Sequence, residues 1–156
     1  DAVRYYDKAC SGLHEIADFY RETIAAINIA SLYARMNDYA KAREWHSLGR
    51  KLAVEHSYID LLVSLEILDG DLDFASLPSP QSGCDAYGRS CDYALWSTPE
   101  VLQNFINIAR KRLARLGIDD RPILCHAILE TCRDGLKSSA PEFFRELVSG
   151  ERERAA

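Results

Sequence analysis

The chain has 156 residues, of which 47% are hydrophobic and 28% are charged, so it can bury one core of ordinary size. Eight glycines and five prolines are too few for a low-complexity or collagen-like polymer. The formal net charge of −5 disfavours a protein that neutralises nucleic-acid phosphates. The sequence also lacks the roughly 18 uninterrupted apolar residues of a membrane-spanning helix. It begins at Asp1 without a Met or the basic and apolar regions of a signal peptide, and we expect it to be part of a larger protein.

Apolar residues recur at helical spacing through residues 1–77, and no segment shows the alternation that is typical of strands. This pattern predicts helices over residues 2–13, 14–36, 39–55 and 58–68. Asn37-Asp38 is predicted to form the turn after the second helix, because both residue types cap helices and tolerate turn geometry. Gly70-Asp71 is expected to end the fourth helix in the same way.

A cluster of Pro, Ser and Gly predicts a loop over residues 78–93. Thr98-Pro99 then begins a helix that extends to residue 116, with a capping hydroxyl followed by proline in the first turn. Two more helices are expected to begin near residues 120 and 139. The prediction is therefore one all-α domain over residues 1–156, in which residues 94–150 form C-terminal helices.

Two segments, residues 29–42 and 62–75, resemble one another. Each passes from an apolar helix face through a small or acidic turn to an apolar residue, and then to alanine three positions later. A small residue at that place lets a second helix approach the first one closely. In the first segment this small residue is Ala42, which we expect to pack against the preceding helix.

These segments resemble the tetratricopeptide repeat, a helix-turn-helix unit of about 34 residues. Within residues 24–55, the positions that match the family pattern are Ala26, Ile29, Ala30, Tyr33, Asn37, Asp38, Tyr39, Ala42, His46 and Gly49. The next unit matches in part, with Glu66 where the family has tyrosine. The resemblance implies an antiparallel array of helix hairpins over residues 1–77, which the C-terminal helices cap. An ordinary helical bundle is the alternative.

In the tetratricopeptide family, the first helices of the units line a concave groove that binds a peptide or helix of a partner. Carried over to this chain, the groove residues would be Ile24, Ile27, Ser31, Ala34, Arg35, Asp60, Ser64 and Ile67. The family's carboxylate-clamping Lys and Asn are absent, since Ile27 and Ser31 stand in their place. A largely apolar groove suits an amphipathic helix or a hydrophobic peptide. Ile24 and Ile27 could instead be core residues.

No arrangement of side chains predicts catalysis or a cofactor. His14 and Glu15 begin an H-E-x-x-H zinc motif, but Asp18 replaces the second histidine. Asp69, Asp71 and Asp73 alternate as in a calcium loop, yet the required glycine is missing. Phosphate-binding glycine loops and nucleophile motifs are also absent. We therefore do not expect an enzyme.

The five cysteines allow more than one interpretation. Cys84 and Cys91 could form a disulfide across the expected loop, and they could equally be buried thiols. Cys125 and Cys132 share one face of a predicted helix, and none of these spacings is typical of a zinc site.

The sequence favours an interaction or sensory module of a regulatory or assembly protein, with a protein or peptide as its partner. One alternative is a helical domain that senses a small molecule or short signal peptide, with residues 78–93 as a lid. Another is a nucleic-acid-binding domain that uses the basic residues Arg110, Lys111, Arg112 and Arg115. The sequence also leaves open whether the chain forms a homo-oligomer. The compartment is not fixed by the sequence, although the cytoplasm is slightly favoured.

Overall fold

The computed structural model describes residues 2–125, and these residues form helices joined by short connections. The complete helices are α1 (Ala2–Glu15), α2 (Phe19–Arg35), α3 (Tyr39–Glu55), α4 (Ile59–Ser76), α5 (Gln81–Leu95) and α6 (Pro99–Arg115). Residues 121–125 are also helical. No strand occurs in residues 2–125, so the prediction of an all-α fold is confirmed. The helix expected near residue 139 lies outside the described residues.

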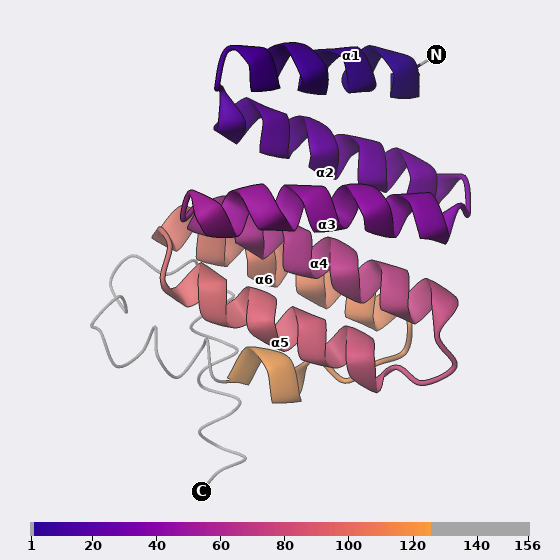
Figure 1. The fold of residues 1–156 in the computed structure, drawn as a ribbon. Coiled ribbons are helices and arrows are strands. Elements are labelled where there is room, and N and C mark those ends of the chain that lie inside the picture. The colour runs from indigo at the N-terminus through magenta and orange to yellow at the C-terminus, as the bar shows by residue number, and fades with distance from the viewer. Residues whose placement is uncertain (1, 126–156) are drawn as a thin grey trace, which may run out of the picture.

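The helices pack in chain order as antiparallel hairpins (Figure 1). Each helix from α1 to α5 contacts the next one, and the hairpins α2–α3 and α4–α5 are the most extensive pairs. In addition, α4 contacts both α2 and α6. The even-numbered helices therefore lie next to one another and form a common face of the array.

Three turns of the same form connect the first four helices. Each contains one residue with positive φ, namely Ala17 (57°), Asn37 (60°) and Ser57 (55°). In each turn, the N–H of the following residue donates to the carbonyl five positions earlier, as in Asp38 N to Tyr33 O at 3.0 Å. The turn predicted at Asn37-Asp38 is confirmed. The predicted continuous helix over residues 14–36 is wrong, because the Ala17 turn separates α1 from α2.

The turn predicted at Gly70-Asp71 is also wrong, because α4 continues through it to Ser76. Gly70 instead permits close packing of α5: a Cβ atom on this residue would lie 2.5 Å from Cδ1 of Tyr87 and 3.0 Å from the carbonyl oxygen of Gly83. Glycine at a close helix approach and glycine at a turn cannot be distinguished from their immediate sequence neighbours.

The predicted loop over residues 78–93 is wrong as well, because most of it forms α5. The prolines at positions 78 and 80 precede this helix and do not interrupt it, and Gln81 N donates to Ser79 Oγ at 3.3 Å at its start. Gly83 lies at the interface with α4, where a Cβ atom would collide with the ring of Phe74. Thus α5 completes a second hairpin with α4.

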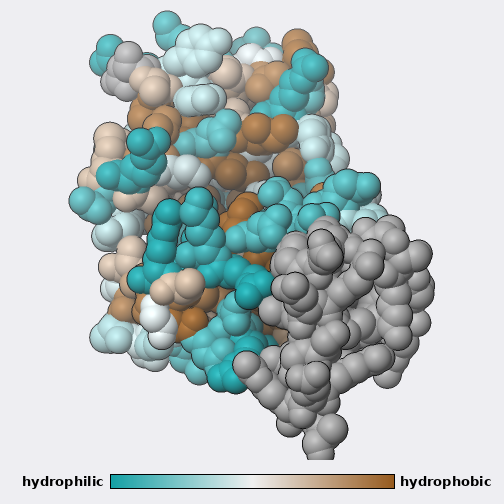
Figure 2. All heavy atoms as spheres, turned by 180° about the vertical axis from the view of Figure 1, so that it is seen from behind, coloured by the Kyte–Doolittle hydropathy of each residue, from teal (hydrophilic) through white to brown (hydrophobic). Residues whose placement is uncertain are grey.

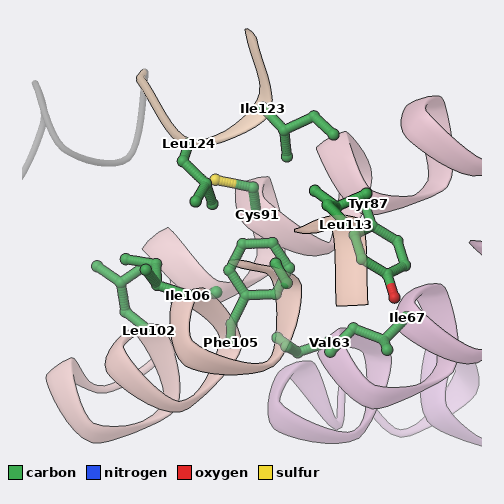
Figure 3. Close-up of a cluster of buried hydrophobic side chains, with 12 residues drawn as sticks. Val63, Ile67, Tyr87, Cys91, Leu102, Phe105, Ile106, Leu113, Ile123 and Leu124 are labelled. Carbon is green, nitrogen blue, oxygen red and sulfur yellow. The ribbon is translucent and has the colours of Figure 1, made fainter. Parts of the chain in front are cut away.

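The largest buried cluster joins α4, α5, α6 and residues 121–125 (Figure 3). Its largest fully buried side chains are Tyr87, Phe105, Ile106, Leu113 and Leu124. A separate cluster joins α2, α3 and α4 around Ala30, Ala42, Leu68 and Leu72. Ala42 has no exposed surface, which confirms the expectation of a close helix contact at this position.

We expect Gly70→Ala to destabilise the protein by about 1–3 kcal/mol, because the added methyl group overpacks the α4–α5 interface. The ring of Tyr87 cannot easily move away, since it is fully buried and its hydroxyl donates to Asp71. The measurement is the midpoint of urea unfolding.

Gly88→Ala is the matched control, because a Cβ atom on this α5 glycine would meet no atom within 4 Å. Replacing an unconstrained helical glycine with alanine should stabilise the protein by about 0.5–1 kcal/mol. Equal midpoint shifts for the two variants would contradict the close-packing role of Gly70.

Candidate functional site

The face formed by α2 and α4 carries exposed apolar side chains next to polar ones. Tyr20 and Ile24 on α2 are 39% and 36% exposed. The Tyr20 hydroxyl donates to Asp60 Oδ2 of α4 at 2.6 Å, and its ring packs edge-on against Tyr58, with ring centroids 5.1 Å apart. Tyr20 is therefore held in place by α4 while one side of its ring remains open to solvent.

The predicted groove residues divide into those that reach this face and those that do not. Ile24 and Ser64 are exposed, and Asp60 is half-buried beside Tyr20. Ile27 is half-buried, and it packs against both of the clusters that connect α2, α3 and α4. Ser31 is half-buried, and its hydroxyl donates to the carbonyl oxygen of Ile27 at 2.9 Å. We define the α2–α4 face by Tyr20, Ile24, Ile27, Ser31, Asp60 and Ser64.

The other three predicted groove residues lie elsewhere. Ile67 is only 7% exposed and belongs to the cluster under α5 and α6, so its placement in a surface groove is wrong. Ala34 packs against the cluster that contains Leu68 and Leu72. Arg35 is exposed at the C-terminal end of α2.

The sequence does not predict a cluster of aromatic side chains that the structure places at one end of the array. Phe19 stacks on His56 with ring centroids 4.6 Å apart, and His56 in turn stacks on Tyr58 at 5.4 Å. These rings lie just after the Ala17 turn and around the Ser57 turn, and they connect the starts of α2 and α4. Nearby, His14 Nδ1 lies 3.1 Å from an oxygen of the buried carboxylate of Glu22.

The side of the array opposite to that of Figure 1 shows a mixed surface (Figure 2). Hydrophobic residues gather in the middle of the upper part of this view, and hydrophilic residues flank them.

Buried carboxylates of α4 form an ion-pair network with α3 and α5. Glu66 is 1% exposed and accepts from Arg50 Nε at 3.3 Å and from Arg89 Nε at 2.9 Å. Asp69 accepts from both Arg43 at 3.3 Å and Arg89 at 3.1 Å. A buried carboxylate is stable only when it is paired and hydrogen-bonded. The network therefore fixes α4 between α3 and α5.

Asp73 extends this network toward the start of α5. It accepts from Arg43 Nη2 at 2.6 Å and from the Ser82 hydroxyl at 2.5 Å. Burial alone would raise the pKa of Asp73, but the hydrogen bonds from Ser82 and Arg43 outweigh burial and hold its pKa below the ordinary value of 3.8. The alternating Asp69, Asp71 and Asp73 thus lie within a helix and bind side chains of the protein, which contradicts a calcium loop at this position.

Two of the four residues in the basic cluster of α6 are paired with carboxylates. Arg110 Nε lies 3.3 Å from Asp120 Oδ2, and Arg112 Nη1 contacts Asp71 Oδ2. These pairs lower the positive charge that the cluster could offer to a phosphate backbone.

A disulfide between Cys84 and Cys91 is ruled out by α5. The two residues are on one helix, and seven positions correspond to about 10.5 Å of rise, beyond the roughly 7 Å that a disulfide can bridge. Neither thiol forms a disulfide, and Cys91 is buried in the cluster of α4, α5 and α6. Cys125 forms no disulfide either, and Cys132 lies outside the described residues.

Within residues 2–125, no group of three or more His, Cys, Asp or Glu side chains is arranged to hold a metal ion. In the same part of the chain, no helix has the length and hydropathy needed to cross a membrane. Comparisons with protein-family models, curated proteins and solved structures give no match to this chain. Function is therefore inferred from the geometry of the described residues.

We expect Asp73→Asn to destabilise the protein by about 1–3 kcal/mol at pH 7, because Arg43 and Ser82 lose a charged acceptor. Since folding lowers the pKa of Asp73, its carboxylate stabilises the fold at pH values above the ordinary pKa of 3.8. That contribution is lost as the pH falls through the lower folded pKa. The difference in unfolding free energy between the wild type and Asp73→Asn should therefore become smaller below about pH 4.

Urea unfolding at a series of pH values between about 7 and 3 measures this difference. Asp92→Asn, an exposed change on the same hairpin, controls for the loss of one carboxylate. A wild-type-to-variant difference that stays constant over the whole range would contradict the role assigned to Asp73.

Proposed function

We propose that this chain is a protein-interaction module, and that the α2–α4 face binds an amphipathic helix or hydrophobic peptide of a partner. The observation that carries the proposal is the exposure of Tyr20 and Ile24 beside α4, where Tyr20 is fixed by Asp60. An aromatic ring that is already held in place loses little conformational entropy on binding, which favours its use as an anchor.

The arrangement of the helices supports a tetratricopeptide-like architecture. The α2–α3 and α4–α5 hairpins place their first helices, α2 and α4, in contact, as the resemblance implies. The chain departs from the family in length, because the span from the Ala17 turn to the Ser57 turn is about 40 residues rather than about 34. We propose a relative with longer helices, in which the face formed by the first helices keeps its binding role.

The residues of this face indicate the chemistry of the partner. Tyr20, Ile24 and the exposed part of Ile27 offer an apolar stripe along α2. Asp60 and Ser64 on α4 lie along its edge and offer polar groups. An amphipathic helix with apolar residues at spacings of three and four, and with polar residues on one flank, would match this surface.

The proposal is tested by selecting binders from a displayed library of 16-residue amphipathic peptides against the wild-type chain. The affinities of the selected peptides are then measured for Ile24→Asp and for Val54→Asp. Both changes replace an exposed branched apolar residue with aspartate, but Val54 is 51% exposed on α3 and lies outside the α2–α4 face.

Ile24→Asp should weaken binding of most selected peptides by about ten-fold or more, since a buried unpaired carboxylate is costly. Val54→Asp should change their affinities by less than about two-fold. Circular dichroism verifies the fold of each variant, and Ser64→Lys tests the same face at an exposed position should Ile24→Asp unfold the chain. Failure to obtain binders, or binders that tolerate both Ile24→Asp and Ser64→Lys, would overturn the proposal.

A further inference from the structure

A hollow of about 400 Å³ lies between the C-terminal parts of α4 and α6. Both helices contribute residues at positions i, i+3 and i+4, so each presents one face to the hollow. The residues that line it are Asp71, Phe74, Ala75, Arg112, Arg115 and Leu116. None of them belongs to the α2–α4 face, so the hollow is a separate feature of the molecule.

The charged groups of the hollow carry a net positive charge. Asp71 is already engaged, because the fully buried Tyr87 donates its hydroxyl to Asp71 Oδ1 at 2.5 Å and Arg112 contacts Oδ2. A guanidinium group has five N–H donors, so Arg112 can be oriented by Asp71 and still donate to a ligand. Arg115 adds a second positive charge, and among the described residues it makes no ion pair.

The remaining lining of the hollow is apolar. Phe74 is half-buried, and its ring packs edge-on against Tyr87 with centroids 5.5 Å apart. Leu116 is 51% exposed, and Ala75 is exposed beside it. The small side chain of Ala75 leaves the space between Phe74 and Leu116 open, so a hydrocarbon group of a ligand can contact both residues.

We propose that this hollow binds a small organic acid in which one carboxylate is attached to an apolar group. The carboxylate would accept hydrogen bonds from Arg112 and Arg115, and the apolar group would pack on Phe74 and Leu116. The C-terminal ends of helices repel an anion, so binding depends on both arginines. Asp71 limits the net charge, which selects a monoanion over a phosphate with two negative charges.

The test uses 3-phenylpropionate as the probe and its neutral amide, 3-phenylpropionamide, as the matched control ligand. Binding to the wild-type chain is measured by nuclear magnetic resonance titration. The acid 3-phenylpropionate should cause saturable shifts in the backbone N–H signals of residues that line the hollow. The control ligand 3-phenylpropionamide should bind at least about ten-fold more weakly.

Arg115→Gln should weaken binding of the acid by about ten-fold, which is the effect of losing one charge-assisted hydrogen bond. Arg110→Gln is the control, because this substitution removes the same charge from the same helix. Arg110 itself pairs with Asp120 and does not line the hollow. It should change the affinity by less than about two-fold. Ala75→Trp, which fills the hollow from an exposed position, should abolish binding.

Equal affinities for the acid and the amide would overturn the proposal, as would binding that survives both Arg115→Gln and Ala75→Trp. Inorganic phosphate that binds the hollow as tightly as 3-phenylpropionate would also overturn it, because the attraction would then be a general one for anions. Circular dichroism confirms that each variant is folded. Should Arg115→Gln unfold the chain, Ala75→Trp decides the outcome.

Discussion

The pairing of Glu66 with two arginines is the constraint on which the arrangement of the array depends. This carboxylate is almost completely buried, and it binds Arg50 of α3 and Arg89 of α5 at the same time. Removing one partner of a buried ion pair destabilises a protein by about 3–5 kcal/mol, because the remaining charge is buried without a partner. The ion pairs therefore hold α4 between α3 and α5, as Figure 1 shows.

The α4 helix also contacts α2 and α6. Along α2, this arrangement places Tyr20 beside Asp60 and exposes Ile24 next to them. Along α6, it places Arg112 against Asp71 at the edge of the hollow. The two surfaces proposed to bind ligands thus both follow from the position of one central helix, although they share no residue.

The sequence predicts the helical class and the Asn37-Asp38 turn, because periodicity and capping are local signals. It does not distinguish a glycine in a turn from a glycine at a close helix contact. Gly70 is therefore predicted to lie in a turn, whereas in the structure it allows Tyr87 to pack closely against α4. The contact of Tyr20 with Asp60 was missed for a different reason. It depends on where the Ala17 turn begins α2, and alanine gives no turn signal. Ile67 was misplaced because its helical position alone does not show which neighbour covers it.

The packing of α1 has a consequence for how the array opens. This helix packs mainly on α2, and among its residues only Cys10 is buried. The free energy of local opening depends on the buried contacts that a segment must lose, so we expect α1 to separate first among the described helices. Glu22 and Ile29, which α1 covers, would then become accessible on α2 while the α4–α5 hairpin stays intact. We therefore expect α1 to unfold locally, with its amide hydrogens exchanging before those of the α4–α5 hairpin.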